Sequence, residues 1–545
     1  MAPTGTRIGL PGAIAIVLGN VVGVAVFLTP PEVARHLPWN RWFLSAWALG
    51  AVPALVGALC MAELGAMLPR SGGDYAYIRE AHGEPLAFLS GWTSTVITFP
   101  GSVAAMAVGL SAFQGAELFG PRILAPAFRA VVWGAGLQLS WAQVVALGII
   151  VAFTALNQLG IAQVGRVQTA LVALPVLGIL IAGAAALIAT PSEATLPAAV
   201  TTDGSPWKSL LPALVPVFFA YSGWNVITYV GDEIRDPART IPRALAVGTL
   251  LAAGLYVLIC WTLLQAVPAA AMPGLGSVPA YACSRLFGSW AGTLSTAVIG
   301  VAVLSSLNAT ILAGARVSRA MSLDGLAFSF LQRRGWRSRA PTRALWLQAG
   351  LSALLVVTGR FEQLLAYVVV VMLLSSSLSV AAVLVLRLRK PDIPRPYRVW
   401  GYPLTPTVYV LFCLLVVAFM ILEERSRAEA LWGMAITALG LPAFWWQRRA
   451  SSGLEAAQGR PPGDCKRPCV ARRYSYRISS TNRSMVSLWL LMVSALSSAS
   501  APHAAVTSRS TGVHSPLTTT AVSSHRSPSW LGATTTSPPP ERARS

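Results

Sequence analysis

The sequence predicts an all-α membrane protein with twelve transmembrane helices. Three observations predict this class: 54% of the 545 residues are hydrophobic, only 11% are charged, and the mean hydropathy is +0.61. This composition is typical of a chain dissolved mostly in lipid. Most apolar runs reach or approach the ~20 residues that cross ~30 Å of hydrocarbon, although 344–358 is short and 141–159 carries polar residues. The runs lie roughly at 10–35, 43–68, 86–113, 141–159, 167–189, 210–231, 244–267, 289–315, 344–358, 363–386, 404–422 and 428–446.

Lysine and arginine are distributed unequally between alternate loops. If the N-terminus is inside, the inner loops hold most of them, with clusters at 333–343 and 387–398, and the outer loops are sparser. Cytoplasmic loops of membrane proteins carry such an excess. We therefore expect a multi-pass protein of the cell (inner) membrane with both termini in the cytoplasm. The net charge of +21 reflects this topology, and no nucleic-acid partner is expected.

The six cysteines predict neither a disulfide framework nor a metal site. Cys60, Cys260 and Cys413 lie within apolar runs, where cysteine behaves as a small hydrophobe. Cys465 and Cys469 have no second pair with which to form a zinc site. The sequence also lacks HExxH, Walker and GxSxG motifs. An enzyme is therefore not predicted, and no cofactor or metal is expected.

The chain divides into a transporter domain at 1–450 and a tail at 451–545. The tail is rich in Ser, Thr, Pro and Arg and poor in acidic residues, and its apolar stretch at 486–496 is too short to span a bilayer. Its composition is typical of disorder. A translated frameshift or unused extension is an equally good interpretation, and we assign the tail no function.

Two apolar runs, the first and the sixth, are interrupted by glycine. Gly23 lies within 19–27, and Gly223 lies within 218–225. Paired broken helices at matching places in two halves of a membrane protein indicate a transporter site at the midplane. We therefore expect two inverted repeats of five helices, at about 8–190 and 209–387, followed by two extra helices at about 404–447. The alternative is that these glycines only allow close helix packing.

Each predicted break would expose backbone groups of one polarity. The amides near Gly23, Val24 and Ala25 would face an anion, because the N-terminus of a half-helix carries free N–H groups and a partial positive charge. The carbonyls near 219–222 would face an ammonium group. A zwitterion, which carries both charges, fits such a pair of sites.

Several motifs carry a family resemblance. The stretch Val22-Gly23-Val24-Ala25-Val26-Phe27 is similar to an Ile-Gly-Ser-Gly-Ile-Phe motif in span one. The other matching stretches are 62–77, 219–225 (Phe-Ala-Tyr-Ser-Gly-Trp-Asn), 231–237, 241–244, 306–308 and 315–317. Over roughly 8–447 the chain resembles the amino acid–polyamine–organocation superfamily, and within it the bacterial relatives of the L-type amino acid transporters. The resemblance implies a fold like that of the bacterial leucine transporter.

The resemblance also implies roles for individual residues. Gly23, Val24 and Ala25 would bind the substrate carboxylate through their amides. Ala220 and Ser222 would offer carbonyls to the amino group of the substrate.

Three aromatic or amide residues of span six complete this expected site. Phe219 would be an aromatic gate above the ligand. Asn225 would reach the substrate or brace the break, and Trp224 would either line the pocket or pack in the kink.

The chain departs from the family pattern at three places. Val24 and Ala25 replace a serine and a glycine, which removes a hydroxyl and stiffens the break. The position matched to a span-five lysine that fills a cation site in many relatives is Pro175, which argues against lysine-based coupling. The outer loop at 115–140 has no cysteine, so no disulfide-linked heavy chain is expected.

Three groups of residues near the expected inner surface are interpreted as structural rather than substrate-binding. We expect Glu63 to cap a helix or pair with a base rather than relay protons. Asp74, Tyr75 and Arg79 are interpreted as an amphipathic inner loop. Asp232, Glu233 and Arg235 are expected to form an inner-surface ion network that latches a closed state, or to be merely solvated.

We therefore predict secondary active transport of amino acids by alternating access, with neutral amino acids preferred. The nearest alternative is a cationic amino acid or polyamine antiporter of the same fold, which would favour an acidic residue in the pocket. A channel or a membrane-embedded enzyme would need charge rings, carbonyl filters or paired intramembrane acids, and the sequence has no such pattern. The coupled species, a proton or an exchanged amino acid, stays open.

Overall fold

The computed structural model describes residues 7–132, 135–191, 196, 205–332, 335, 340–358, 361–445 and 447. The chain divides into two compact units, Met1–Arg477 and Ile478–Ser545, and all described residues belong to the first. The predicted tail at 451–545 lies outside the described residues. The predicted domain boundary therefore stays a prediction.

The first half of the chain is helical except for one hairpin. Its elements are α1 (Leu10–Val21), α2 (Ala25–Leu28), α3 (Pro30–His36), α4 (Asn40–Met67), α5 (Asp74–His82), α6 (Glu84–Thr93), η2 (Ser94–Thr98), α7 (Phe99–Gly109), η3 (Leu110–Gln114), α8 (Gly115–Phe119), η4 (Pro121–Leu124), β1 (Pro126–Val132), β2 (Ala135–Ser140), α9 (Trp141–Asn157) and α10 (Ile161–Ala185). The η labels mark short 3-10 or π-helical segments.

All the regular elements of the second half are helices within its described residues. Its elements are α11 (Pro206–Ala220), η5 (Trp224–Tyr229), η6 (Gly231–Glu233), α12 (Pro237–Ala266), η7 (Ala269–Gly274), α13 (Val278–Phe287), α14 (Ser289–Leu323), η8 (Ser329–Gln332), α15 (Thr342–Thr358), α16 (Phe361–Arg389), α17 (Leu404–Leu422) and α18 (Glu424–Ala438).

The predicted apolar runs all fall on helices. Within the described residues, nine helical stretches are long and apolar enough to cross a membrane. Three shorter apolar helices, Trp141–Asn157, Thr342–Thr358 and Ala430–Trp445, coincide with three other predicted runs. The structure is therefore that of a predominantly helical, multi-pass membrane protein. The count of twelve spans stays a prediction.

The loop predicted at 115–140 contains secondary structure that the sequence analysis missed. Strands β1 and β2 pair antiparallel, with Val132 opposite Ala135 and an irregularity between Pro126 and Phe128. The hairpin ends directly at α9, which begins with a capping box: the backbone N–H of Gln143 donates to the Ser140 hydroxyl, and the Gln143 side chain accepts from the Ser140 amide at 2.8 Å. The chain therefore passes from strand to helix without a loop.

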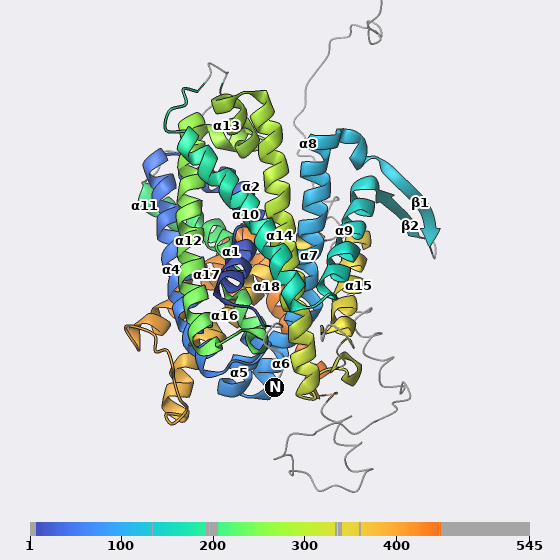
Figure 1. The fold of residues 1–545 in the computed structure, drawn as a ribbon, viewed down its shortest axis with the longest axis vertical. Helices are drawn as coiled ribbons and strands as arrows, with labels where there is room; N and C mark the ends of the chain where they lie inside the picture. Colours follow the sequence, from blue (N-terminus) through green and yellow to red (C-terminus); the bar gives the residue numbers. More distant parts are fainter. Residues whose placement is uncertain are drawn as a thin grey trace, which may run out of the picture. The chain divides into compact units, whose positions relative to one another are not determined.

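Helix α1 lies in the middle of the bundle. It contacts α10, α12, α14 and the short helix η5, and Figure 1 shows it enclosed by neighbouring helices. Helix α14 is also central, with 78% of its apolar window buried, whereas only 28% of the window of α10 is buried. Leu174, Leu177 and Leu180 of α10 are exposed and form a face suited to lipid. The core therefore forms around the two interrupted spans.

Candidate functional site

The first interrupted span breaks where the sequence predicted a break. Helix α1 ends at Val21, and helix α2 begins at Ala25. The amide of Gly23 donates to the carbonyl of Val21 at 2.7 Å, so it is already used inside the turn. The amides of Val24 and Ala25 donate to no backbone carbonyl of the described residues. Two of the three amides assigned to a carboxylate are thus available.

The second interrupted span breaks between α11 and η5. Gly223 has φ +93° and ψ −2°, a left-handed conformation that favours glycine. The carbonyl of Phe219 accepts from the amide of Ser222 at 3.0 Å. The carbonyl of Ser222 accepts from no backbone donor among the described residues. Of the carbonyls predicted to face an ammonium group, that of Ser222 is therefore unoccupied by the protein.

Asn20, which the sequence analysis did not single out, joins the two breaks. Its side-chain Nδ2 donates to the carbonyl of Gly223 at 2.9 Å, and its Oδ1 accepts from the Thr310 hydroxyl of α14 at 3.2 Å. The backbone carbonyl of Asn20 accepts from the Ser306 hydroxyl at 3.1 Å. A polar residue inside an apolar span, three positions before Gly23, was the available signal.

Tyr256 of α12 caps the C-terminal ends of both broken helices. Its Oη lies 2.6 Å from the carbonyl oxygen of Val21 and 2.8 Å from that of Ala220. Both carbonyls belong to the last turns of half-helices, where intrahelical donors run out. A phenol has one hydrogen to donate, so the two carbonyls share it. The Ala220 carbonyl, assigned to the substrate ammonium, therefore already lies beside a protein donor.

The remaining predicted residues of span six lie in different environments. Phe219 is half-buried. Trp224 is buried and packs edge-on to Tyr409 of α17, at 6.3 Å between ring centroids. A Cβ atom added to Gly57 of α4 would lie 2.6 Å from each of these two rings. Asn225 points its Nδ2 toward the Asp74 carboxylate, at 3.3 and 3.4 Å.

An ion pair holds the loop after the second break to α14. Arg316 donates through Nε and a terminal nitrogen to the two carboxylate oxygens of Glu233, at 2.8 and 2.9 Å, and the Arg316 side chain is buried. The N-terminal segment is tied to the same loop, because the Ile8 amide donates to the Glu233 carbonyl at 3.0 Å and the Arg235 amide donates to the Ile8 carbonyl at 2.8 Å. These contacts join the N-terminal segment, the loop after the second break and α14.

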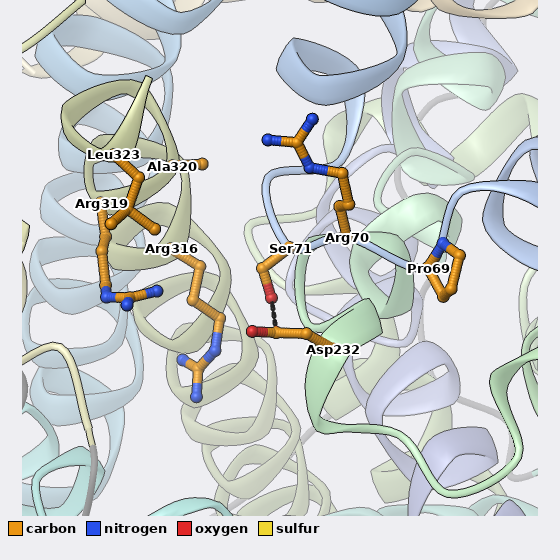
Figure 2. A pocket seen from close by; sticks show the side chains of 8 residues that line it. All are labelled: Pro69, Arg70, Ser71, Asp232, Arg316, Arg319, Ala320 and Leu323. Atoms are coloured by element: carbon orange, nitrogen blue, oxygen red, sulfur yellow. Dashed lines mark hydrogen bonds between the residues drawn. The ribbon is translucent and has the colours of Figure 1, made fainter. Parts of the chain in front are cut away.

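A pocket of about 160 Å³ opens beside this ion pair. Figure 2 shows Arg316 and Arg319 extending from α14 toward the turn that carries Arg70 and Ser71. The Asp232 carboxylate lies between the two sides and accepts a hydrogen bond from the Ser71 hydroxyl. The expected inner-surface network therefore contains arginines of α14 as well as the acids of the loop.

Glu63 lies in a second buried ion pair. It is 1% exposed and accepts from Arg387 of α16 at 2.6 and 2.8 Å. The Val399 amide, beyond α16, donates to the same carboxylate at 2.7 Å. The prediction that Glu63 pairs with a base is therefore confirmed. The pair ties α4 to the end of α16 and to the segment that leads into α17.

A chain of buried amides lies beneath the first break. Asn157 of α9 donates to Asn308 of α14 at 2.8 Å, Asn308 donates to Gln168 of α10 at 2.7 Å, and Gln168 donates to the Ser305 hydroxyl at 3.0 Å. Gln168 is two helical turns before Pro175, the position matched to the relatives' lysine. Gln168 is the polar side chain of α10 that faces α1, and the sequence analysis did not identify it.

The two breaks carry no ionised side chain of their own. The stretches 22–25 and 219–225 contain no acidic or basic residue, so backbone amides and carbonyls supply their polarity. Among the described residues there is no group of three or more His, Cys, Asp or Glu that could hold a metal ion.

A multi-pass helical bundle with two broken spans meeting at its centre defines a membrane transporter for a small solute. Residues 8–441 match a family described as amino acid permease, so both breaks and all the apolar helices up to Leu441 are covered. The chain belongs to this family, within the amino acid–polyamine–organocation superfamily, and it transports amino acids. The family is one of transporters, not enzymes.

Curated relatives of the chain are similar along most of their length. The chain is 27% identical over 449 residues to the serine/threonine exchanger SteT of Bacillus subtilis (strain 168), covering 81% of this chain and 97% of the relative. It is 27% identical over 449 residues to the Asc-type amino acid transporter 1 of Mus musculus, covering 81% and 80%. It is 28% identical over 461 residues to the large neutral amino acids transporter small subunit 2 of Homo sapiens, covering 81% of each.

Proposed function

We propose that the chain carries neutral amino acids across the cytoplasmic membrane by alternating access, with the substrate held between the two breaks. The carboxylate accepts hydrogen bonds from the amides of Val24 and Ala25, aided by the positive end of α2. The ammonium group donates to the carbonyl of Ser222 and shares that of Ala220 with Tyr256. The observation that carries this proposal is the pair of breaks, one with unused amides and one with an unused carbonyl, joined by Asn20.

The preference for neutral substrates rests on the surroundings of the breaks. A second charge on the substrate would need a partner, because an unpaired charge is costly to desolvate. Asp74 contacts Asn225 of span six and is itself buried. The names of the three relatives describe a serine/threonine exchanger and transporters of amino acids, one of them of large neutral amino acids. These names agree with a neutral substrate.

The inverted repeat is supported by helix lengths. The second helices of the two halves, α4 and α12, have 28 and 30 residues. The third apolar stretches, Glu84–Phe119 and Ser289–Leu323, have 36 and 35. The fourth helices, α9 and α15, have 17 each. Short helices α5 and α13, of 9 and 10 residues, occupy the same place before each long third stretch. We therefore retain twelve spans as five plus five, followed by two.

The proposed orientation places the Glu233–Arg316 pair at the cytoplasmic side. The arginine-rich loops lie on that side, and both termini with them, in accordance with the positive-inside rule. The structure then corresponds to a state closed toward the cytoplasm, in which the expected latch is formed by Glu233 and Arg316. Because the 115–140 loop has no cysteine, we propose that the chain works without a disulfide-linked heavy chain.

Transport by the purified full chain in liposomes tests the proposal. Labelled alanine or leucine should exchange against internal unlabelled amino acid. Unlabelled leucine, serine and phenylalanine should compete better than lysine, arginine or putrescine. Stronger competition by arginine or putrescine would replace the neutral assignment with the cationic one. Absence of exchange for all of these amino acids would contradict the proposed function.

A further inference from the structure

Asp74 is a buried acid without a cation. Glu63 and Asp74 are the two acidic residues buried within the described chain, at 1% and 7% exposure. Glu63 pairs with Arg387, whereas Asp74 forms no ion pair with a described residue. Its partners are neutral: the Tyr229 hydroxyl donates at 2.9 Å, and Asn225 Nδ2 lies at 3.3 Å. Asp74, which was interpreted as part of an amphipathic inner loop, is instead a buried residue at the first position of helix α5.

Two glycines form the turn that places Asp74 in this buried position beside η5. Gly72 and Gly73 have φ values of +120° and +51°, and Asp74 begins α5 immediately after them. A Cβ atom on Gly73 would lie 2.5 Å from the ring of Tyr229, so only glycine allows the turn to pack this closely. The chain thus reverses against η5 and directs the carboxylate inward.

Burial and hydrogen bonding act on the Asp74 carboxyl in opposite directions. Burial raises the pKa of Asp74 above its ordinary value, because the ionised form loses its hydration. The hydrogen bonds from Tyr229 and Asn225 partly offset this rise, since they stabilise the carboxylate. Both protonation states are therefore supported by the surrounding groups.

A proton on Asp74 would also find an acceptor. The Ser379 hydroxyl of α16 is fully buried and faces the carboxyl, and it has no partner apart from Asp74 among the described residues. It can donate to the carboxylate, which also lowers the pKa of Asp74, and it can accept from a protonated carboxyl. Protonation therefore keeps the contact with α16, with its direction reversed, but weakens the contacts with η5, because Tyr229 and Asn225 then no longer donate to a charged group.

The titratable groups that face Asp74 are tyrosines. They are Tyr229 of η5, Tyr77 of α5 and Tyr409 of α17. The charged groups on the other elements around α5 are paired elsewhere: Arg387 of α16 with Glu63, and Arg79 of α5 with Asp324 at the end of α14 at 2.9 Å. A change in the charge of Asp74 would thus act mainly on its hydrogen bonds with η5.

Helix α5 connects the second break to the inner ion pairs. Asp74, at its first position, holds Asn225 and Tyr229, which directly follow the break. One residue later, the Tyr75 hydroxyl donates to Asp324 at 3.0 Å, and Asp324 also pairs with Arg70 at 3.2 Å. Loss of the carboxylate would release η5 from a helix that is fixed to α14.

We propose that Asp74 is a proton-binding site, and that its protonation frees η5 from α5 and so favours opening of the transporter on this side. This inference rests on the proposed function, because η5 carries one side of the substrate site. Exchange should therefore be fast below the pKa of Asp74 and should slow as the pH rises through it.

The test compares exchange of labelled alanine by the full chain in liposomes, at equal pH on both sides, from acidic to mildly alkaline pH. Asp74→Asn fixes a neutral side chain of the same shape, so exchange should stay at the fast, acidic rate at every pH. Tyr229→Phe removes a donor to the carboxylate, so the midpoint should move upward by up to about one pH unit. Glu80→Gln, on the same helix but paired with Lys390 near the surface, should leave the midpoint unchanged.

The outcomes separate this inference from the proposed function. Wild-type exchange that does not depend on pH, or an unchanged pH profile in Asp74→Asn, would overturn the proton site and leave amino acid transport intact. If Asp74→Asn does not reach the membrane, an unmoved midpoint in Tyr229→Phe would overturn it instead. A wild-type chain that exchanges no amino acid at any pH would overturn the proposed function, and this inference with it.

Discussion

The side-chain amide of Asn20 donates to the backbone carbonyl of Gly223, 203 positions later in the chain, at 2.9 Å. Gly223 allows this contact because a Cβ atom there would lie 2.4 Å from the same nitrogen. The two breaks are therefore held together by one side chain, and Asn20 also reaches α14 through Thr310. This junction fixes how far the amides of one break lie from the carbonyls of the other.

Asn20→Leu should reduce exchange by about 10-fold or more. The change keeps the branching and the number of heavy atoms but removes two hydrogen bonds, each worth about 0.5–1.5 kcal/mol. Initial exchange rates in liposomes, normalised to folded protein in the membrane, measure this effect. Thr310→Val leaves the bond between Asn20 and Gly223 intact and should give a smaller loss, although it removes the Thr310 bond to the Ser306 carbonyl as well as the bond to Oδ1. Equal losses in the two variants would argue that the contact with Gly223 contributes nothing.

Gly23→Ala should impair transport through a contact with α14. The new Cβ would lie 2.8 Å from the Ser306 hydroxyl oxygen and 2.9 Å from its Cβ. Adding Ser306→Gly removes both atoms and should restore part of the exchange, whereas Ser306→Ala leaves the Cβ and should restore less. Glycine within α14 itself costs about 1 kcal/mol, so the rescue will be partial. A Gly23→Ala chain that exchanges normally would show that the break tolerates a side chain.

Tyr256→Phe should destabilise the protein by about 1–3 kcal/mol, because it leaves the Ala220 carbonyl without its donor and leaves the Val21 carbonyl with the Gly23 amide alone. Thermal unfolding in detergent measures this change. Tyr221→Phe is the matched control: its hydroxyl donates to the Trp47 carbonyl, which lies inside α4 and has an intrahelical donor as well. The control should therefore cost less, and an equal cost would contradict the special role of the helix ends.

Glu63→Gln should destabilise the protein by a few kcal/mol, toward the lower end of the ~3–5 kcal/mol seen when one partner of a buried pair is removed. The lower value is expected because the Arg387 side chain is still 19% exposed. Glu63→Gln combined with Arg387→Met removes the charge of Arg387 and should recover part of the loss, although Arg395, whose Nε lies 3.7 Å from the Glu63 carboxylate, keeps its charge. Thermal unfolding of the single and double variants is the measurement. A double variant less stable than Glu63→Gln would count against charge burial as the cause.

The sequence predicted the places of the breaks better than their partners. Gly23 and Gly223 stand out in apolar runs because glycine weakens a helix locally, and the helices do end beside them. Asn20 had a local signal as a polar residue inside an apolar span, but its partners, like those of Tyr256 and Gln168, lie on distant helices that no local pattern identifies. Asp74 was interpreted only as part of an amphipathic inner loop. Its burial depends on the close approach of Gly73 to Tyr229, which a single sequence does not encode visibly.

The count of unused groups at the two breaks has a kinetic consequence. With the site empty, the amides of Val24 and Ala25 lack backbone acceptors and the carbonyl of Ser222 lacks a backbone donor within the described chain. Enclosing each such group without water or ligand costs about 1–3 kcal/mol, whereas an amino acid satisfies both kinds at once. We therefore predict that the empty carrier reorients more slowly than the loaded one, so that transport proceeds by exchange of one amino acid for another. Efflux of labelled substrate should show strong trans-stimulation by external amino acid, and equal efflux without it would exclude this mechanism.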